Sequence, residues 1–170
     1  SRDGRSLAFA ADKGQGFDIY VIAANGGEPR RITSVDGDER WPSWTTDGRI
    51  IFSQRQHGRW RLSAVPAAGG AVTPLFSDTA ADDEREGRVS PDGKRIAYIS
   101  DRQSDDGDVD LWIADLSPGP RDRVNRTRVA RVRGLEGFPS WSPDATRLAF
   151  FAVREGLPSV WVASIDDLAG

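Results

Sequence analysis

The 170-residue sequence has no cysteine, no methionine and a single histidine, His57. A chain without cysteine forms no disulfide, has no thiolate nucleophile and binds no zinc through sulfur. No apolar run approaches the roughly 18 residues that a membrane-spanning helix needs, so we expect no membrane insertion. With 23 basic against 26 acidic residues, the chain also lacks the excess of basic residues that is typical of nucleic-acid-binding proteins. What remains is the composition of a loop-rich globular protein.

Enzymatic chemistry also finds little support in the sequence. Nucleophilic catalysis needs a nucleophile, a base and an orienting group within reach of one another. His57 lies in Gln54–Arg59, where we expect an exposed hairpin, and no Gly-x-Ser-x-Gly motif is present. We therefore predict no catalytic residues in this chain.

A short turn motif recurs four times, and each copy leads into a short apolar run. The turns are residues 2–5, 46–49, 90–94 and 142–146. The aromatic residue in each following run recurs at spacings of 43, 46 and 52: Phe9, Phe52, Tyr98 and Phe150. This period is typical of a four-stranded blade of a β-propeller.

Each repeat contains further strand-like segments. β-branched and aromatic runs follow at 18–22, 59–63, 110–114 and 159–163. Shorter segments come after paired glycines at 31–33 and 74–76, and others precede the turns at 41–44, 86–89 and 138–141. We predict an all-β propeller segment of about four antiparallel blades of four strands. Its first and last blades are incomplete, and its approximate units are residues 1–37, 38–80, 81–133 and 134–170.

The recurring turn has a physical basis. In the third copy Pro91 presets φ, Asp92 accepts backbone hydrogen bonds, and Gly93 takes a positive φ without steric cost. Ala145 stands at the glycine position of the last copy, where we expect strain or a shifted turn.

Residues 90–102 and 110–116 resemble the Pro-Asp, WD-like repeat of TolB-type β-propellers, and residues 138–144 resemble its innermost strand and turn. The resemblance covers essentially the whole chain. It implies a propeller that binds a protein or peptide without catalysis, as a scaffold in the bacterial envelope. Periplasmic or extracytoplasmic location follows from the resemblance alone, and a cytoplasmic location stays open.

Two interpretations of the organisation remain. TolB-like propellers have six or more blades, so the chain is either a piece of a larger propeller or closes by itself or with a second copy. Open ends would favour self-association through unpaired strand edges. A second functional hypothesis is a gating or regulatory part of a larger hydrolase, of the prolyl-oligopeptidase or amidohydrolase kind. A third is a sensor module of a kinase or regulator.

Aligning the repeats places glutamates at one position, in the loop that enters the strand before each turn: Glu39, Glu84 and Glu136. We predict a carboxylate ring at a channel mouth, with Arg40 and Arg85 beside it, that would attract a cationic or N-terminal group. Alternatively, each glutamate accepts loop N–H bonds within its own blade. The six tryptophans fit core packing, with Trp41 as the exception, at the channel rim.

A weak calcium site is a further hypothesis. Asp105, Asp106, Asp108 and Asp110 flank Gly107 in an acidic segment, and calcium takes six to eight oxygen ligands. The spacing does not match an EF-hand, so an acidic, solvated hairpin is the alternative. No other cofactor is expected.

Overall fold

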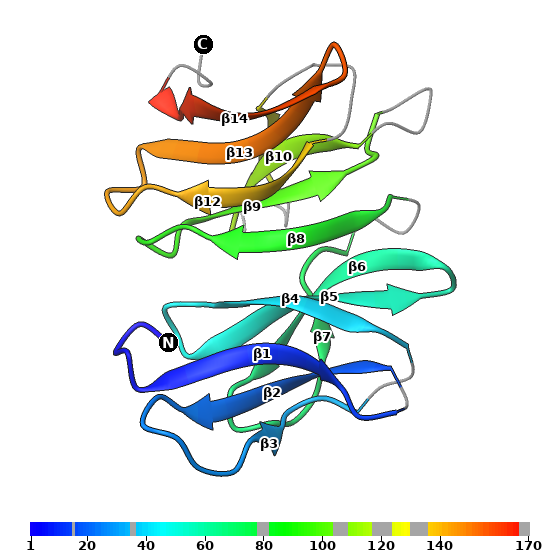
Figure 1. Ribbon diagram of the computed structural model, residues 1–170, viewed down its shortest axis with the longest axis vertical. Coiled ribbons are helices and arrows are strands. Elements are labelled where there is room, and N and C mark those ends of the chain that lie inside the picture. The colour runs from blue at the N-terminus through cyan, green and yellow to red at the C-terminus, as the bar shows by residue number, and fades with distance from the viewer. Residues whose placement is uncertain are drawn as a thin grey trace. The chain divides into compact units, whose positions relative to one another are not determined.

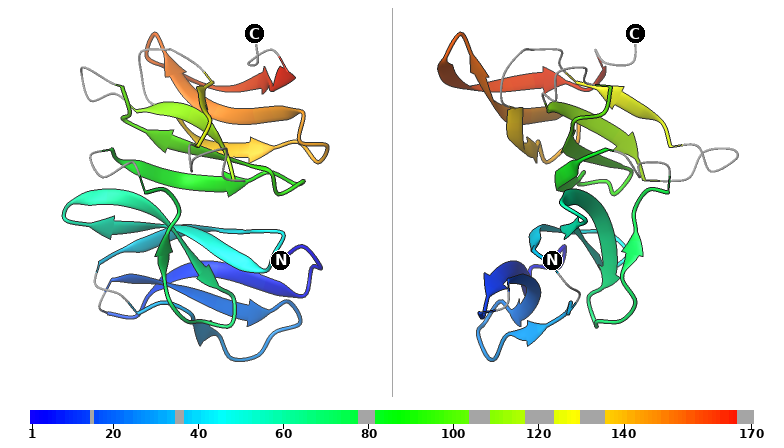
Figure 2. Two further views of the ribbon diagram at one scale, coloured as in Figure 1. Left: turned by 180° about the vertical axis from the view of Figure 1, so that it is seen from behind. Right: turned by 90° about the vertical axis from the view of Figure 1, so that its right-hand side faces the viewer.

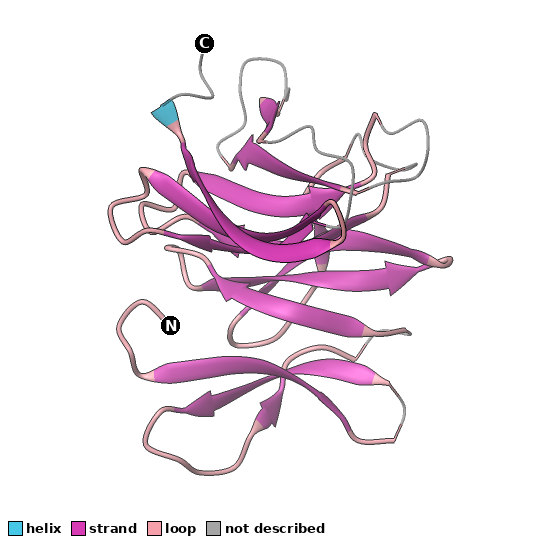
Figure 3. Cartoon of the chain, turned by 45° about the horizontal axis from the view of Figure 1, so that its top comes forward, coloured by secondary structure: helices cyan, strands magenta, loops and turns pink. Residues whose placement is uncertain are grey.

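The computed structural model describes residues 1–14, 16–34, 37–77, 82–103, 109–116, 124–129 and 136–166 (Figure 1). Their regular structure is strand apart from one short helical turn near the C-terminus (Figure 3). The strands are β1 (Ser6–Asp12), β2 (Phe17–Ala23), β3 (Arg30–Arg31), β4 (Glu39–Trp44), β5 (Arg49–Gln56), β6 (Arg59–Pro66), β7 (Thr73–Pro74), β8 (Glu84–Val89), β9 (Arg95–Ser100), β10 (Asp110–Asp115), β11 (Arg126–Arg128), β12 (Glu136–Trp141), β13 (Arg147–Arg154) and β14 (Leu157–Ser164). Across these described residues, no helix has the length and apolar character to cross a membrane.

These strands form four antiparallel sheets in which strands that are consecutive in sequence lie side by side. The two middle sheets, β4–β7 and β8–β11, have four strands each, whereas β1–β3 and β12–β14 have three. The predicted all-β propeller segment with incomplete first and last blades is confirmed. By its place after the turn, β1 corresponds to the second strand of a middle sheet, and β14 corresponds to the third strand.

The chain divides into two compact units, Ser1–Ala81 and Asp82–Gly170. The first contains β1–β7 and the second β8–β14, and Figure 2 shows the strands of each in two further views. The predicted boundaries of the four repeats, and their membership of a single propeller domain, stay a prediction.

The recurring turn is held by a hydroxyl–carboxylate pair that joins its two strands. The Ser90 hydroxyl donates to Asp92 (2.6 Å), which also accepts from the Lys94 N–H (3.1 Å). The Arg95 N–H in turn donates to Ser90 Oγ (3.0 Å). The same pairing joins Ser1 to Asp3, Thr45 to Asp47 and Ser142 to Asp144. The predicted role of the aspartate is confirmed, and the hydroxyl two residues earlier adds a second link.

The glycine position of this turn has a positive φ in every copy. Gly93 has a φ of 74°, and Ala145 keeps the same left-handed conformation at 58°. The last turn is therefore not shifted, and Ala145 carries the steric cost of its Cβ in this region.

The strands β4, β8 and β12 share a β-bulge that the sequence does not signal. Their pairing registers shift between Arg40 and Ser43, between Arg85 and Arg88, and between Gly137 and Ser140. In each strand the first residue of the bulge has a positive φ, although none of the three is glycine: Trp41 (55°), Glu86 (58°) and Phe138 (52°). Strain that recurs at equivalent positions requires support from surrounding contacts.

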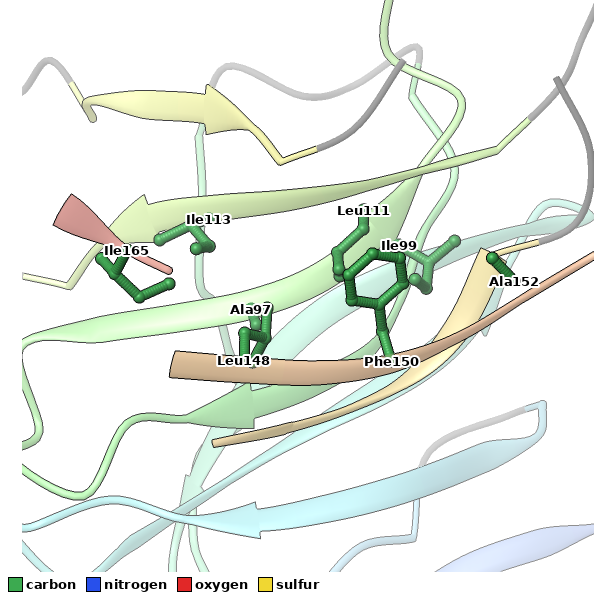
Figure 4. Close-up of a cluster of buried hydrophobic side chains, with 8 residues drawn as sticks. All are labelled: Ala97, Ile99, Leu111, Ile113, Leu148, Phe150, Ala152 and Ile165. Carbon is green, nitrogen blue, oxygen red and sulfur yellow. The ribbon is translucent and has the colours of Figure 1, made fainter. Parts of the chain in front are cut away.

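A hydrophobic cluster lies between sheets within each unit. In the second unit, residues of β9 and β10 pack against residues of β13 and against Ile165 (Figure 4). In the first unit, Ile19 and Ile32 pack with Ile50, Phe52 and Val65 of the second sheet. Burial of these apolar faces supplies the main driving force for stacking one sheet on the next.

The strand β14 ends the last sheet and exposes apolar side chains. Leu157, Val160 and Val162 are all strongly exposed, and Trp161 lies beneath the Arg154 guanidinium at 3.7 Å. Exposed apolar edges favour association, so self-association stays a prediction for this chain.

Candidate functional site

The three aligned glutamates begin β4, β8 and β12, and all are buried. Glu39 is 0 % exposed, Glu84 1 % and Glu136 3 %. Burying a carboxyl group is costly unless it is hydrogen-bonded or neutralised. Their burial does not favour direct contact with a partner, and their role in a binding site stays a prediction.

Glu39 connects the first two sheets. Its Oε2 accepts a hydrogen bond from the Thr33 hydroxyl, and the Thr33 oxygen in turn accepts one from the Ile19 N–H of β2 at 3.0 Å. Its Oε1 has no hydrogen-bond partner within the described part of the chain. Burial raises the pKa of Glu39 to about 7, with the nearby Asp18 adding to the rise. Near neutral pH this group is therefore partly protonated.

Glu136 contacts the equivalent strand position directly in the second unit, whereas Glu39 does so through Thr33. Its Oε2 accepts from the Leu111 N–H of β10 at 2.9 Å, and burial raises its pKa to about 6. Ile19 and Leu111 occupy the same position in their sheets. Each comes one residue before the residue that pairs with the repeat aromatic of the preceding strand: Tyr20 pairs with Phe9, and Trp112 pairs with Tyr98. Each of these two glutamates therefore binds the sheet before its own rather than its own blade, which differs from the alternative considered from sequence.

Glu84 lies in a polar environment that includes a tyrosine. Burial raises the pKa of the Tyr98 hydroxyl, and the nearby Glu84 carboxylate raises it further. The positive charge of Arg126 of β11 opposes this rise in the pKa. The phenol is therefore fixed in its neutral form and is not a candidate base.

The next position on these strands holds Arg40, Arg85 or Gly137. Arg40 lies over the Phe17 ring, 3.8 Å from its centroid, and 3.4 Å from Asp38. Arg85 lies 3.5 Å from Asp83. Each arginine thus has an aspartate two residues before it, an arrangement worth little in stability where water screens the charges.

The bulge residue projects a different side chain in each strand. The Trp41 ring meets Trp60 edge-on, with centroids 5.0 Å apart. Glu86 Oε2 accepts a hydrogen bond from the Phe138 N–H at 2.7 Å. This bond stabilises the strained backbone of Phe138. Phe138 itself is 63 % exposed, although its ring meets that of Phe151 edge-on, with centroids 6.4 Å apart. Because the three bulge residues differ in type, only their alignment could have indicated a common conformation.

A hollow of about 420 Å³ lies beside Phe138, entirely within the second unit. Phe138, Pro139 and Trp141 form its apolar wall, with Arg88 beside them. The indole of Trp141 donates to the Arg88 carbonyl at 2.9 Å, which fixes that wall. A rigid surface with an exposed aromatic ring is suited to contact another polypeptide.

The predicted calcium ligands are only partly described. Asp105, Asp106 and Asp108 lie outside the described residues. Asp110 is buried and paired with Arg128, as Asp18 is paired with Arg31 at 2.7 Å. This ion pair does not favour Asp110 as a calcium ligand, and the calcium hypothesis otherwise stays untested.

His57 lies at the predicted place, in the exposed turn between β5 and β6, with a positive φ of 49°.

The sequence model of the protein family described as the TolB beta propeller domain matches residues 1–119 of this chain. The chain belongs to the TolB β-propeller family. An uncharacterised protein of Agrobacterium fabrum is 26 % identical over 165 residues, covering 88 % of this chain and 52 % of that protein. The Tol-Pal system protein TolB of Alcanivorax borkumensis is 34 % identical over 114 residues, covering 63 % of this chain and 23 % of the relative.

The fold of this TolB-family chain is also found in a solved structure. The crystal structure of TolB from Acinetobacter baumannii superposes with a TM-score of 0.78 at 21 % identity, covering 97 % of this chain and 39 % of that one. The chain therefore spans about half, or less, of the length of these relatives.

Proposed function

We propose that this chain is a non-catalytic binding module that holds a protein or peptide segment on its second unit, beside the bulge of β12. The observation that carries the proposal is Phe138, which is 63 % exposed on a strained bulge beside a hollow of about 420 Å³. Exposing a large ring at a position that also costs backbone strain has no benefit for folding. A recognition role explains both features.

The neighbouring residues fit polypeptide recognition. Aromatic residues and arginine are enriched at the centres of protein interfaces, and Phe138, Trp141 and Arg88 supply both kinds. In the first unit, Arg40 and Trp41 occupy the corresponding strand and are also braced by aromatic rings. The six residues predicted from sequence as a binding surface remain part of this proposal, with Arg40, Trp41 and Arg85 better placed for contact than the buried glutamates.

A place in the bacterial envelope is the second part of the proposal. It rests on membership of the TolB family and on relatives named as components of a Tol-Pal system. The chain would act there as a periplasmic scaffold, without chemistry of its own.

A peptide selection tests the binding role. A displayed library of random 12-residue peptides is selected on the immobilised chain, and enriched sequences are synthesised for fluorescence polarisation. Phe138→Ala is expected to weaken binding at least tenfold, as truncation of an aromatic anchor does. Leu157→Ala, at an exposed apolar residue of β14, is the matched control and should change binding less than twofold. Failure to enrich any peptide, or equal binding to both variants, would contradict the proposal.

A further inference from the structure

The sequence contains two asparagines, Asn25 and Asn125, which lie in different surroundings. Asn25 belongs to the turn between β2 and β3, where residues 23–28 are all exposed. Asn125 comes directly before β11. The following residue also differs, being Gly26 after the first asparagine and Arg126 after the second. This difference matters because the backbone nitrogen after an asparagine is the group that can attack the side-chain amide.

The turn that contains Asn25 has a counterpart in the second sheet. The Gly26 N–H donates to the Ala23 carbonyl at 3.0 Å, and the Gly69 N–H donates to the carbonyl three residues before it at 2.8 Å. Both glycines have a positive φ, of 97° and 87°. The place of Asn25 is taken by Ala68 in the second sheet. This turn conformation therefore does not require an asparagine.

The two asparagines also differ in how their side chains are held. Among the described residues, none forms a hydrogen bond with the Asn25 amide. The Asn125 amide donates to Asp115 Oδ2 at 3.1 Å. The residue after it, Arg126, pairs with Ala114 of β10, so its backbone is held in a strand. Of the two, Asn25 alone combines an exposed turn, an amide without such a bond and a following glycine.

We propose that Asn25 is a site of spontaneous deamidation, with water as the co-reactant. The Gly26 nitrogen attacks Cγ of Asn25, and the new C–N bond closes a succinimide ring. The bond from Cγ to Nδ2 breaks, and ammonia leaves with the proton of the Gly26 nitrogen. Water then adds to one of the ring carbonyls and opens the ring, which gives aspartate or isoaspartate. Nothing is oxidised or reduced.

Glycine permits this attack in an exposed turn. It has no Cβ to hinder the approach of its nitrogen to Cγ, and its backbone has a wide range of allowed φ and ψ. In the closed turn the Gly26 N–H is bonded to the Ala23 carbonyl, so the attack requires the turn to open. Exposed turns open locally at little cost in free energy. The reaction therefore proceeds in the folded chain, more slowly than in an unstructured peptide.

The modification alters a junction between the first two sheets. Arg30 follows the turn, and its guanidinium donates to the carbonyls of Ala67 and Ala68 at 2.7 and 2.8 Å. Isoaspartate at residue 25 would add a carbon to the main chain ahead of Arg30. The longer turn would displace Arg30 from these carbonyls, so the isoaspartate product weakens this contact between the sheets.

Peptide mapping by mass spectrometry tests the proposal. The folded chain is incubated at neutral and at mildly alkaline pH, and enzymatic methylation measures the isoaspartate formed. We expect the acid to accumulate roughly tenfold faster at Asn25 than at Asn125, because Gly26 lacks a Cβ and Arg126 does not. The rate at Asn25 should rise with pH, since the attacking nitrogen must lose its proton. Absence of conversion at Asn25, or equal rates at the two asparagines, would overturn the proposal.

A variant and a peptide complete the test. Asn25→Ala introduces the residue found at this place in the second sheet, and it should abolish the conversion without changing thermal unfolding. Conversion that persists in this variant would contradict the assignment to Asn25. A synthetic peptide of residues 20–30 is the unstructured reference and should convert faster than the folded chain. Conversion of the peptide alone would show that the bond from Gly26 to Ala23 keeps the turn closed, which would also overturn the proposal.

Discussion

Glu86 Oε2 accepts a hydrogen bond from the backbone N–H of Phe138 at 2.7 Å, and both residues have a positive φ. The bond joins the bulges of β8 and β12, so each strained strand stabilises the other. An ideal Cβ on Gly137 would lie 3.3 Å from the same carboxylate oxygen. The glycine thus allows the close approach that this bond needs.

We predict that Glu86→Ala lowers the free energy of unfolding by about 1–3 kcal/mol, because it leaves the Phe138 N–H without its acceptor. Glu86→Gln keeps an oxygen acceptor and should cost clearly less. Urea denaturation of both variants measures the difference. Equal stability of Glu86→Ala and the parent would show that the bond does not support the bulge.

Stability should fall as the pH rises from about 4.5 to about 7. Burial raises the pKa of Glu39 from 4.5 to about 7 and that of Glu136 from 4.5 to about 6. Between these values the folded chain binds more protons than the unfolded chain, so raising the pH favours unfolding, and the loss is complete above the folded pKa.

Glu39→Gln isolates this effect, because its side chain stays neutral at every pH. Its stability should exceed that of the parent at pH 8 by an amount on the order of 2 kcal/mol and approach it at pH 4.5. Urea midpoints at the two pH values give the comparison. A pH dependence that is the same in variant and parent would disprove the assignment to Glu39.

Ala145→Gly should stabilise the chain by about 0.5–1 kcal/mol, because relief of the left-handed conformation outweighs the greater entropy of unfolded glycine. The reciprocal change Gly93→Ala, at a φ of 74°, should destabilise by about 1–2 kcal/mol. Thermal unfolding of both variants tests the pair. Changes of the same sign would mean that packing around the turns, rather than φ, sets their stability.

The sequence predicted the features that depend on local residue types. Turns with Asp92 and Gly93 and the strands beside them need only short-range chemistry, and period alone indicated the propeller fold. Burial of Glu39 was not predictable, because it depends on Thr33, which is itself bonded to Ile19 of the sheet before. The bulges could not be predicted from the sequence, because Trp41, Glu86 and Phe138 share a backbone conformation but no residue type.

The pairing of residues across neighbouring strands shows a related limit. Ser63 and Pro74 are ordinary residues in the sequence. Their meaning emerges only when the strand register places them opposite each other, where other sheets have Tyr20 with Arg31 or Trp112 with Arg128. Such pairing between strands is set by their register and is not evident from the order of the repeats alone.

The turn carboxylate Asp144 should titrate far below an ordinary aspartate. The Ser142 hydroxyl is the largest cause that lowers its pKa from 3.8 to about 2, followed by the Thr146 N–H and hydroxyl. Ser142→Ala is expected to raise this pKa towards 3.8, measured from the carboxyl ¹³C shift in an NMR titration. Ser140→Ala, an exposed change two residues earlier, is the control and should leave the pKa unchanged. An unaltered titration in Ser142→Ala would show that the Ser142 hydroxyl does not control the carboxylate, and that the N–H and hydroxyl of Thr146 stabilise its charge.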